Sequence, residues 1–251
     1  GECGLPVVYA NLVGGQDELI FDGASFVMDA GGNLVHQLPA FEEALRVVEF
    51  ENTQPQLGEI VPEHSLEQNV YRALCLGVSD YVGKNGFPGV VLGLSGGIDS
   101  ALVLAIAVDA LGAERVHAVM MPSQFTADIS LHDAEAMATT LGVQYSEISI
   151  KPVFDAFLDS LADEFDRLPF DTAEENIQAR IRGTLLMALS NKFGSIVITT
   201  GNKSEMAVGY ATLYGDMAGG FAVLKDVPKT MVYKLARYRN QLGPAIPERV
   251  I

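Results

Sequence analysis

The feature that most constrains this chain is a glycine-rich turn between two apolar stretches. The turn has the sequence Gly93-Leu94-Ser95-Gly96-Gly97-Ile98-Asp99-Ser100; residues 90–92 before it are apolar, and no helix breaker follows until Gly112. This pattern predicts a buried strand, a tight turn and the first turns of a buried helix. Such a turn directs backbone N–H groups and the positive end of a helix dipole at one point, so it predicts a phosphate site.

Asp99 indicates that this phosphate site depends on a metal ion. The common nucleotide-binding loop has a lysine before its final Ser or Thr, whereas Asp99 occupies that place here. A carboxylate beside a polyphosphate is repulsive unless a divalent cation lies between them, so we expect Asp99 to bind Mg²⁺. The alternative is a glycine turn whose acid only caps the helix.

Strands and helices alternate after residue 64. The expected strands are residues 90–92, 116–121, 143–150 and 196–199. The expected helices are residues 65 to 83 or 86, 101–111, 130–141, 153–165 and 173–193. Ser65 and Ser130 are the candidate caps of the first and third helices. Alternation of this kind predicts a doubly wound α/β domain, with a parallel sheet covered by helices on both faces. The glycine turn and Thr200-Gly201-Asn202 each follow a strand, so one crevice at the carboxyl ends of the strands is expected to hold both.

The first 50 residues have a different, β-rich pattern. Strands are expected at residues 5–10, 19–21, 25–29 and 46–50, with a turn at 31–33 and no helix. Residues 51–63 are polar and contain two prolines, which is typical of an interdomain linker. We therefore predict two domains, residues 1–55 including linker sequence and residues 56–251.

Composition excludes several classes of partner. The formal net charge of −16 argues against nucleic acid and anionic membranes. No apolar run is long enough for a membrane span and no basic leader precedes one, so the cytoplasm is expected. Cys3 and Cys75 are too few for a disulfide framework or a metal cluster, and the four histidines lack zinc-binding spacing.

Several motifs resemble known families. Residues 95–100 resemble the signature of the ATP pyrophosphatases, which cleave ATP between its α and β phosphates. Residues 175–183, 199–205, 209–216 and 226–230 resemble the NAD synthetase family, in the order of that family, and this resemblance extends over residues 56–251. Residues 9–26 are similar to the late part of the nitrilase-type glutaminase domain that is fused to glutamine-dependent NAD synthetases, so the first domain resembles a remnant of a nitrilase-like α/β sandwich.

The resemblance implies a ligase that amidates deamido-NAD to NAD through an acyl adenylate. ATP is the co-substrate and yields AMP and pyrophosphate, Mg²⁺ is the metal, and glutamine supplies ammonia in the full-length protein. The glutaminase residues of the family precede residue 9, and the sequence around Cys3 differs from that of the catalytic cysteine, so we expect no glutamine hydrolysis. The family also implies a homodimer through the synthetase domain or a higher homo-oligomer.

The resemblance also implies roles for individual residues. The implied catalytic residues are Asp99, Lys229 and Asp216. The implied ATP-binding residues are Gly93, Leu94, Ser95, Gly96, Gly97, Ile98, Asp99, Ser100, Thr200 and Lys229. The implied deamido-NAD-binding residues are Asn176, Arg180, Lys203 and Glu205. The implied metal ligands are Asp99 and Glu205.

The positions of these residues are chemically reasonable in their own right. Asn176 and Arg180 are four apart and share one helix face, whereas Arg180 and Arg182 diverge, so at most one of them is expected in the site. Lys203 and Glu205 would point in opposite directions if extended. Lys229 lies near a helix start, where a cation is unfavourable unless an anion such as phosphate accompanies it.

Two other functions remain open from the sequence. One is an adenine-nucleotide-binding module that does not cleave ATP, although Asp99, Glu205 and Lys229 argue against it because a binder needs no such set. The other is a different amidating ATP pyrophosphatase, which would not use deamido-NAD.

Overall fold

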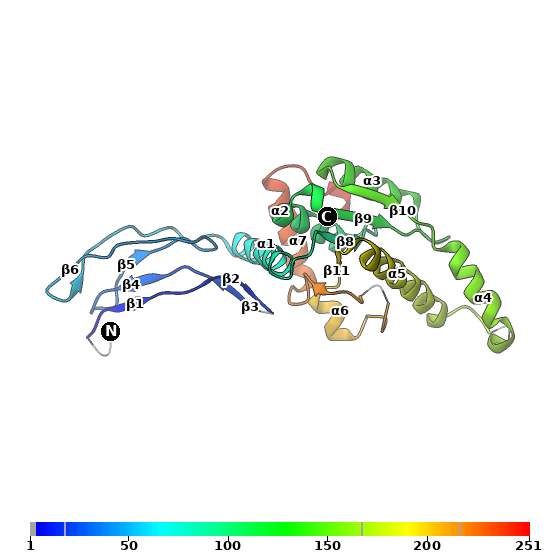
Figure 1. The fold of residues 1–251 in the computed structure, drawn as a ribbon, viewed down its shortest axis with the longest axis horizontal. Coiled ribbons are helices and arrows are strands. Elements are labelled where there is room, and N and C mark those ends of the chain that lie inside the picture. Colours follow the sequence, from blue (N-terminus) through cyan, green and yellow to red (C-terminus); the bar gives the residue numbers. More distant parts are fainter. Residues whose placement is uncertain (1–3, 18, 167, 216) are drawn as a thin grey trace. The chain divides into compact units, whose positions relative to one another are not determined.

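The computed structural model describes residues 4–17, 19–166, 168–215 and 217–251 (Figure 1). Contacts between Cα atoms divide the chain into two compact units, Gly1–Tyr81 and Val82–Ile251. This division falls inside helix α1 (Leu66–Lys84). The predicted domain boundary after residue 55 stays a prediction.

The first unit consists of short antiparallel strands and most of helix α1. Strands β1 (Val7–Tyr9), β4 (Phe26–Met28) and β5 (Leu34–Gln37) form a sheet in the order β1-β4-β5. Two hairpins pair β2 (Val13–Gln16) with β3 (Leu19–Asp22) and β6 (Phe50–Glu51) with β7 (Gln54–Pro55). The expected cap of α1 is confirmed, since the N–H of Gln68 donates to Ser65 Oγ at 3.2 Å.

The strand expected at residues 46–50 is wrong. The backbone is irregular up to Glu49, and only Phe50 belongs to a strand, the two-residue β6. The side chains of Leu45 and Val47 are 97% and 80% exposed. The local apolar pattern suggested a strand, but no burial of these side chains stabilises an extended pairing.

The second unit contains a five-stranded parallel sheet (Figure 1). Its strands are β8 (Val90–Gly93), β9 (Val116–Met120), β10 (Gln144–Glu147), β11 (Ile196–Thr199) and β12 (Phe221–Ala222). They are ordered β10-β9-β8-β11-β12, and every neighbouring pair is parallel. The predicted doubly wound α/β fold is confirmed, and its strand order reverses between β8 and β11, where ligands bind in such sheets.

Helices cover both faces of this sheet. They are α2 (Ile98–Leu111), α3 (Asp128–Leu141), α4 (Lys151–Phe165), α5 (Thr172–Phe193), α6 (Lys203–Val208) and α7 (Lys229–Gln241). Val91 and Val119 pack with Phe154 of α4 and with Ile181 and Leu186 of α5 in one core cluster. Side chains alternate along a strand, so the neighbours of Val91 and Val119 point to the other face, where α2 contacts β8, β9 and α7.

The start of α3 differs from the prediction. Ser130 was the expected cap, but the helix begins at Asp128, and Ala127 at the cap position supplies no side-chain hydrogen bond. Ser130 instead lies in the first turn of α3, where it packs against the glycine turn described below. None of the helices in the described ranges is both long and apolar enough to cross a membrane.

Candidate active site

The glycine turn connects β8 to α2 at the carboxyl end of the sheet. The N–H of Leu94 donates to the carbonyl of Val119 at 2.9 Å, which fixes the start of the turn to strand β9. Gly97 is the cap residue of α2, so no side chain of the cap covers the first N–H groups of the helix. The predicted strand, turn and helix are all present, and the end of the helix that attracts anions is open at this point.

The two serines shape the turn from inside. Ser100 is buried; its hydroxyl accepts from the N–H of Ser95 at 3.1 Å and donates to the carbonyl of Gly97 at 3.0 Å. Ser95 is exposed, and its hydroxyl lies 3.0 Å from that of Ser100 and accepts from the N–H of Gly97 at 3.2 Å. Ser95 is therefore the serine whose hydroxyl a bound phosphate reaches more readily, while Ser100 is engaged within the turn.

Gly96 permits a close approach between the turn and α3. Its φ angle is +79°, which favours glycine. A Cβ at this position would lie 2.7 Å from the carbonyl oxygen of Ser130 and 2.8 Å from its Cβ. Any larger residue at position 96 would therefore push the first turn of α3 away from the glycine turn.

Three polar side chains meet where the strand order reverses. Asp99, in the first turn of α2, accepts a hydrogen bond on Oδ1 from Asn202 Nδ2 at 2.9 Å. Its other oxygen, Oδ2, pairs with the ammonium group of Lys229, the first residue of α7. The predicted meeting of the glycine turn with the segment after β11 is thus confirmed, and it occurs through Asn202, for which the sequence suggested no role.

Lys229 has an anionic partner within the chain. The sequence suggested that a phosphate would explain a lysine at this helix start, but the carboxylate of Asp99 already compensates its charge. The side chains of Asp99 and Lys229 are 18% and 37% exposed, so solvent reaches the pair in part. A contact of Lys229 with phosphates stays a prediction.

Residues 203–205 are helical, so the divergence of Lys203 and Glu205 expected for an extended chain does not apply here. Asn202 caps α6, because its Oδ1 accepts from the N–H groups of Ser204 at 2.9 Å and Glu205 at 3.1 Å. In return, Glu205 Oε2 accepts from the N–H of Asn202 at 3.1 Å. The Asn-x-x-Glu spacing of this capping box was the available sequence signal. It makes Glu205 half-buried beside Asn202, while Lys203 is exposed.

Asn176 and Arg180 form hydrogen bonds to the same loop, as expected from their shared helix face. Thr212 Oγ1 donates to Asn176 Oδ1 at 2.7 Å, and Arg180 Nε donates to the carbonyl of Leu213 at 3.2 Å. Arg182 diverges as expected, since its Nε donates to the carbonyl of Met121 at 3.2 Å. Thr200 is half-buried just after β11. Asp216 lies outside the described residues.

Two carboxylates near the turn suit magnesium bound together with a nucleotide. No group of three or more His, Cys, Asp or Glu side chains with metal-binding geometry occurs among the described residues. Asp99 and Glu205 are nevertheless both hydrogen-bonded to Asn202. Mg²⁺ is commonly held by one or two carboxylates plus substrate phosphates, so this donor set fits a metal that arrives with ATP better than a metal enclosed by protein.

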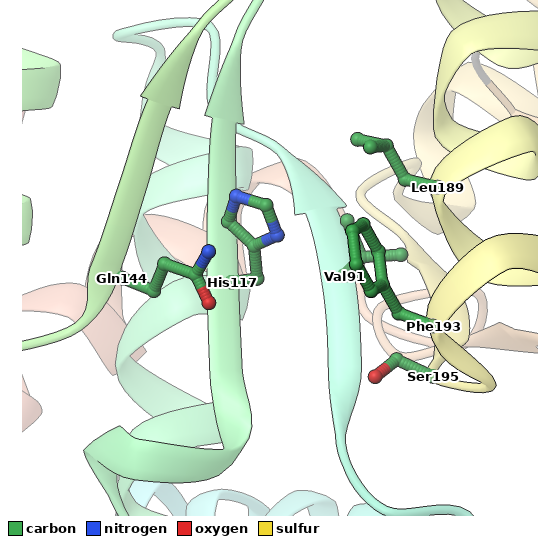
Figure 2. Close-up of a pocket in the computed structure, with 6 residues that line it drawn as sticks. All are labelled: Val91, His117, Gln144, Leu189, Phe193 and Ser195. Carbon is green, nitrogen blue, oxygen red and sulfur yellow. The ribbon is translucent and has the colours of Figure 1, made fainter.

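A separate hollow lies at the amino end of the same sheet (Figure 2). It contains about 460 Å³ of empty space, part of it open to solvent, and is lined by Val91, His117, Gln144, Leu189, Phe193 and Ser195. The Nε2 atom of His117 lies 2.8 Å from Ser146 Oγ, and burial lowers the pKa of His117 below its ordinary value. Since Asp99, Asn202 and Lys229 follow the opposite ends of the strands, this hollow is not part of their cluster.

A glycine turn, two carboxylates and a lysine at the reversal point of a parallel sheet define a doubly wound nucleotide-binding protein. The model of the family described as NAD synthase matches residues 70–251. The chain therefore belongs to the NAD synthase family.

Individual relatives agree with this assignment. The chain is 55% identical over 249 residues to the glutamine-dependent NAD(+) synthetase of Acinetobacter baylyi, covering 98% of this chain and 46% of that protein. Its fold matches the glutamine-dependent NAD+ synthetase of Acinetobacter baumannii in complex with ADP at a TM-score of 0.96, with 54% identity and coverage of 99% and 48% of the two chains. It also resembles the NMN synthetase of Francisella tularensis, with a TM-score of 0.67, 30% identity and 74% coverage of each chain. The chain spans about half the length of the curated relatives that it matches.

Proposed function

We propose that this chain is the synthetase portion of an enzyme that amidates deamido-NAD to NAD. ATP is consumed and gives AMP and pyrophosphate, and glutamine supplies the ammonia in the whole protein. Membership of the NAD synthase family and the names of the relatives support this proposal. The observation that carries it in the structure is the contact of Asp99 with both Asn202 and Lys229 beside the glycine turn.

The chemistry explains why ATP is needed. A carboxylate does not react with ammonia directly, because oxide is a very poor leaving group. Attack of the nicotinate carboxylate on the α phosphorus of ATP expels pyrophosphate and forms an acyl adenylate. Ammonia then attacks the acyl carbon, the C–N bond forms, AMP leaves, and one proton of the attacking nitrogen passes to a base. Alignment of the reactants and compensation of charge at phosphorus are the main demands on the protein.

The residues around the turn suit the phosphate part of this reaction. The backbone of residues 93–100 and the hydroxyl of Ser95 would bind the leaving pyrophosphate, and Lys229 would contact the phosphates. Asp99 and Glu205 would hold Mg²⁺, which when bound offsets the negative charge of the polyphosphate. Because Lys229 already lies against Asp99, its positive charge is placed at the turn before any nucleotide binds.

The remaining assignments are supported by the resemblance in sequence. Thr200 would bind ATP, and Asn176, Arg180, Lys203 and Glu205 would bind deamido-NAD. Asn176 and Arg180 would do so together with the loop that they already hold. Asp216 would accept a proton from ammonium. A homodimer or higher homo-oligomer and a cytoplasmic location remain proposals as well.

The direct test is an incubation of the chain with ATP, Mg²⁺, deamido-NAD and ammonium, with the products identified by mass spectrometry. Equimolar NAD, AMP and pyrophosphate are expected, and glutamine in place of ammonium is expected to give none of them. Bound ATP that is never converted to AMP, in this chain and in the full-length protein, would instead identify a binding module.

A second candidate substrate is the mononucleotide, nicotinate mononucleotide. The relative named NMN synthetase is 30% identical to this chain and shares its fold. The same incubation with nicotinate mononucleotide distinguishes the two substrates. A higher kcat/KM for the mononucleotide than for deamido-NAD would overturn the proposed substrate while leaving the reaction type unchanged.

A further inference from the structure

We propose that Asn202 is a positioning residue: it holds the carboxylates of Asp99 and Glu205 in fixed positions relative to each other, so that both face one metal–nucleotide complex. The mechanistic part of this inference rests on the proposed function. The contact itself is tested separately through folding stability.

Both the amide nitrogen and the amide oxygen of the buried Asn202 side chain have hydrogen-bond partners. The residue is 0% exposed, and its side chain serves two elements at once. Its amide nitrogen donates to Asp99 Oδ1 at 2.9 Å, across 103 residues of sequence, while its amide oxygen accepts two N–H groups of α6. Because each side of the amide has its own partners, the side chain has one favourable orientation, and its rotation would leave buried polar groups unpaired.

Asn202 therefore links the two acids through hydrogen bonds whose donors are uncharged. Its amide nitrogen binds the carboxylate of Asp99, and its backbone N–H binds Glu205 Oε2 at 3.1 Å. Neither bond brings a positive charge. Asn202 and Lys229 each contact one oxygen of the Asp99 carboxylate and so fix its direction. Each carboxylate oxygen has a further lone pair with which it can accept a divalent cation.

The capping role alone does not explain why this residue is asparagine. Asn, Asp and Ser cap helices about equally well. Aspartate at position 202 would place a second carboxylate against Asp99, and serine is too short to reach it. The contact with Asp99 is therefore what selects an amide at this position.

The stability test exchanges the side chains of Asp99 and Asn202, and we call the resulting double variant the swapped pair. Asn202→Asp keeps the cap but sets two carboxylates against each other, so the urea midpoint is expected to fall. Asp99→Asn alone removes the ion pair with Lys229. In the double variant Asp99→Asn/Asn202→Asp, an amide again faces a carboxylate, so the midpoint is expected to be higher than the sum of the two single changes predicts. Additive changes would overturn the claimed contact.

The kinetic test separates positioning from capping. Asn202→Ser keeps a capping hydroxyl and loses the amide, and is expected to lower kcat/KM for NAD formation by about 10- to 100-fold, the usual effect of removing a partner of a metal ligand. It is also expected to raise the Mg²⁺ concentration for half-maximal turnover, and the double variant is expected to remain slow because its carboxylate has moved from position 99.

The matched control is Asp171→Ser. Asp171 forms the capping box of α5 with Glu174, so this change also replaces one capping side chain by serine in the same unit. Its Mg²⁺ dependence is expected to equal that of the unchanged chain. If Asn202→Ser behaves like this control in kcat/KM and in Mg²⁺ dependence, Asn202 is only a cap and the positioning role is wrong. If neither the unchanged chain nor the full-length protein makes NAD, the proposed function fails, while the swapped pair still decides whether the contact exists.

Discussion

The two units of this chain differ in how deeply their strands are buried. In the first unit many large apolar side chains are exposed, among them Leu5, Val8, Leu12, Leu45 and Leu57. In the second unit, strands β8 and β11 and most of α2 are buried. The difference shows what a doubly wound sheet requires, because helices on both faces bury its central strands, β8 and β11.

This difference also locates the candidate site. Asp99, Asn202 and Lys229 stand at the first turns or caps of three helices of the second unit, and buried residues support each of these positions. Full burial of one large apolar side chain contributes about 1.5–3 kcal/mol, so the packed sheet can hold polar groups in fixed positions. Among the described residues of the first unit, strands β1 and β3 are largely exposed, and burial in its strands is concentrated in β4 and β5, at residues such as Val27 and Val35.

The largest expected effect concerns the site itself. Asp99→Ala removes the acid that joins Asn202 and Lys229, and it is expected to lower kcat for NAD formation by roughly 100- to 1000-fold, the range seen when one electrostatic contact to a transition state is lost. The control is Asp109→Asn, which changes an acid of the same helix that is bonded to Arg239. This control is expected to retain its turnover; near-normal turnover of Asp99→Ala would refute the role of that residue.

The second prediction compares a buried leucine of the second unit with an exposed leucine of the first. Leu104, in the middle of α2, is 0% exposed, and Leu104→Ala is expected to lower the free energy of unfolding by about 2–5 kcal/mol. Leu45 is 97% exposed, and Leu45→Ala is expected to change it by less than about 0.5 kcal/mol. Urea unfolding followed by circular dichroism measures both. Equal changes in the free energy of unfolding would show that the difference in burial between these two positions does not translate into stability.

The third prediction separates backbone strain from crowding within the second unit. Gly96 and Gly86 have similar φ angles, +79° and +72°, but only Gly96 would place a Cβ against another residue, Ser130. Both Gly96→Ala and Gly86→Ala carry the strain of a positive φ, about 1–2 kcal/mol. Gly96→Ala is expected to lose about 1–3 kcal/mol more through overpacking and to weaken ATP binding. Equal stabilities in urea, with unchanged ATP affinity by calorimetry, would show that α3 moves away freely.

The smallest expected effect is a pH dependence at the hollow of Figure 2. Burial lowers the pKa of His117 from its ordinary value of 6.5, so the folded chain binds fewer protons there than the unfolded chain. Stability is therefore intact above pH 6.5, falls as the pH drops from 6.5 to the lowered pKa, and does not recover below it. In His117→Gln, the urea midpoint is expected to depend less on pH in this window. An unchanged pH dependence would show that His117 does not cause the loss of stability.

Local sequence was sufficient wherever one segment carried its own signals. The turn at residues 93–100 is flanked by apolar stretches, which gave β8 and α2 close to their observed bounds. The capping pattern that begins at Ser65 gave the start of α1, because this signal also lies within a few residues. The residues 46–50 were misassigned because an apolar pattern does not show whether a neighbouring strand or face exists to bury it.

The candidate site was predicted in part. Family motifs placed Asp99, Glu205 and Lys229 on the list of site residues, and the structure joins Asp99 to Lys229 directly and links both acids to Asn202. Asn202 was missed because its importance depends on a residue 103 positions away. Its only local signal was the capping spacing to Glu205, which accounts for the helix but not for the contact with Asp99.

The sequence by itself determined the order of strands and helices from α1 to β11, the glycine turn and the family of this chain. These follow from short-range periodicity, from the conformational freedom of glycine and from motifs that lie within a few residues. Only the tertiary structure decided that Lys229 neutralises Asp99, that Asn202 holds two acids together, and that Ser130 requires glycine at position 96. Each of these depends on side chains brought together by the parallel sheet, and their distances are set by packing that no local pattern records.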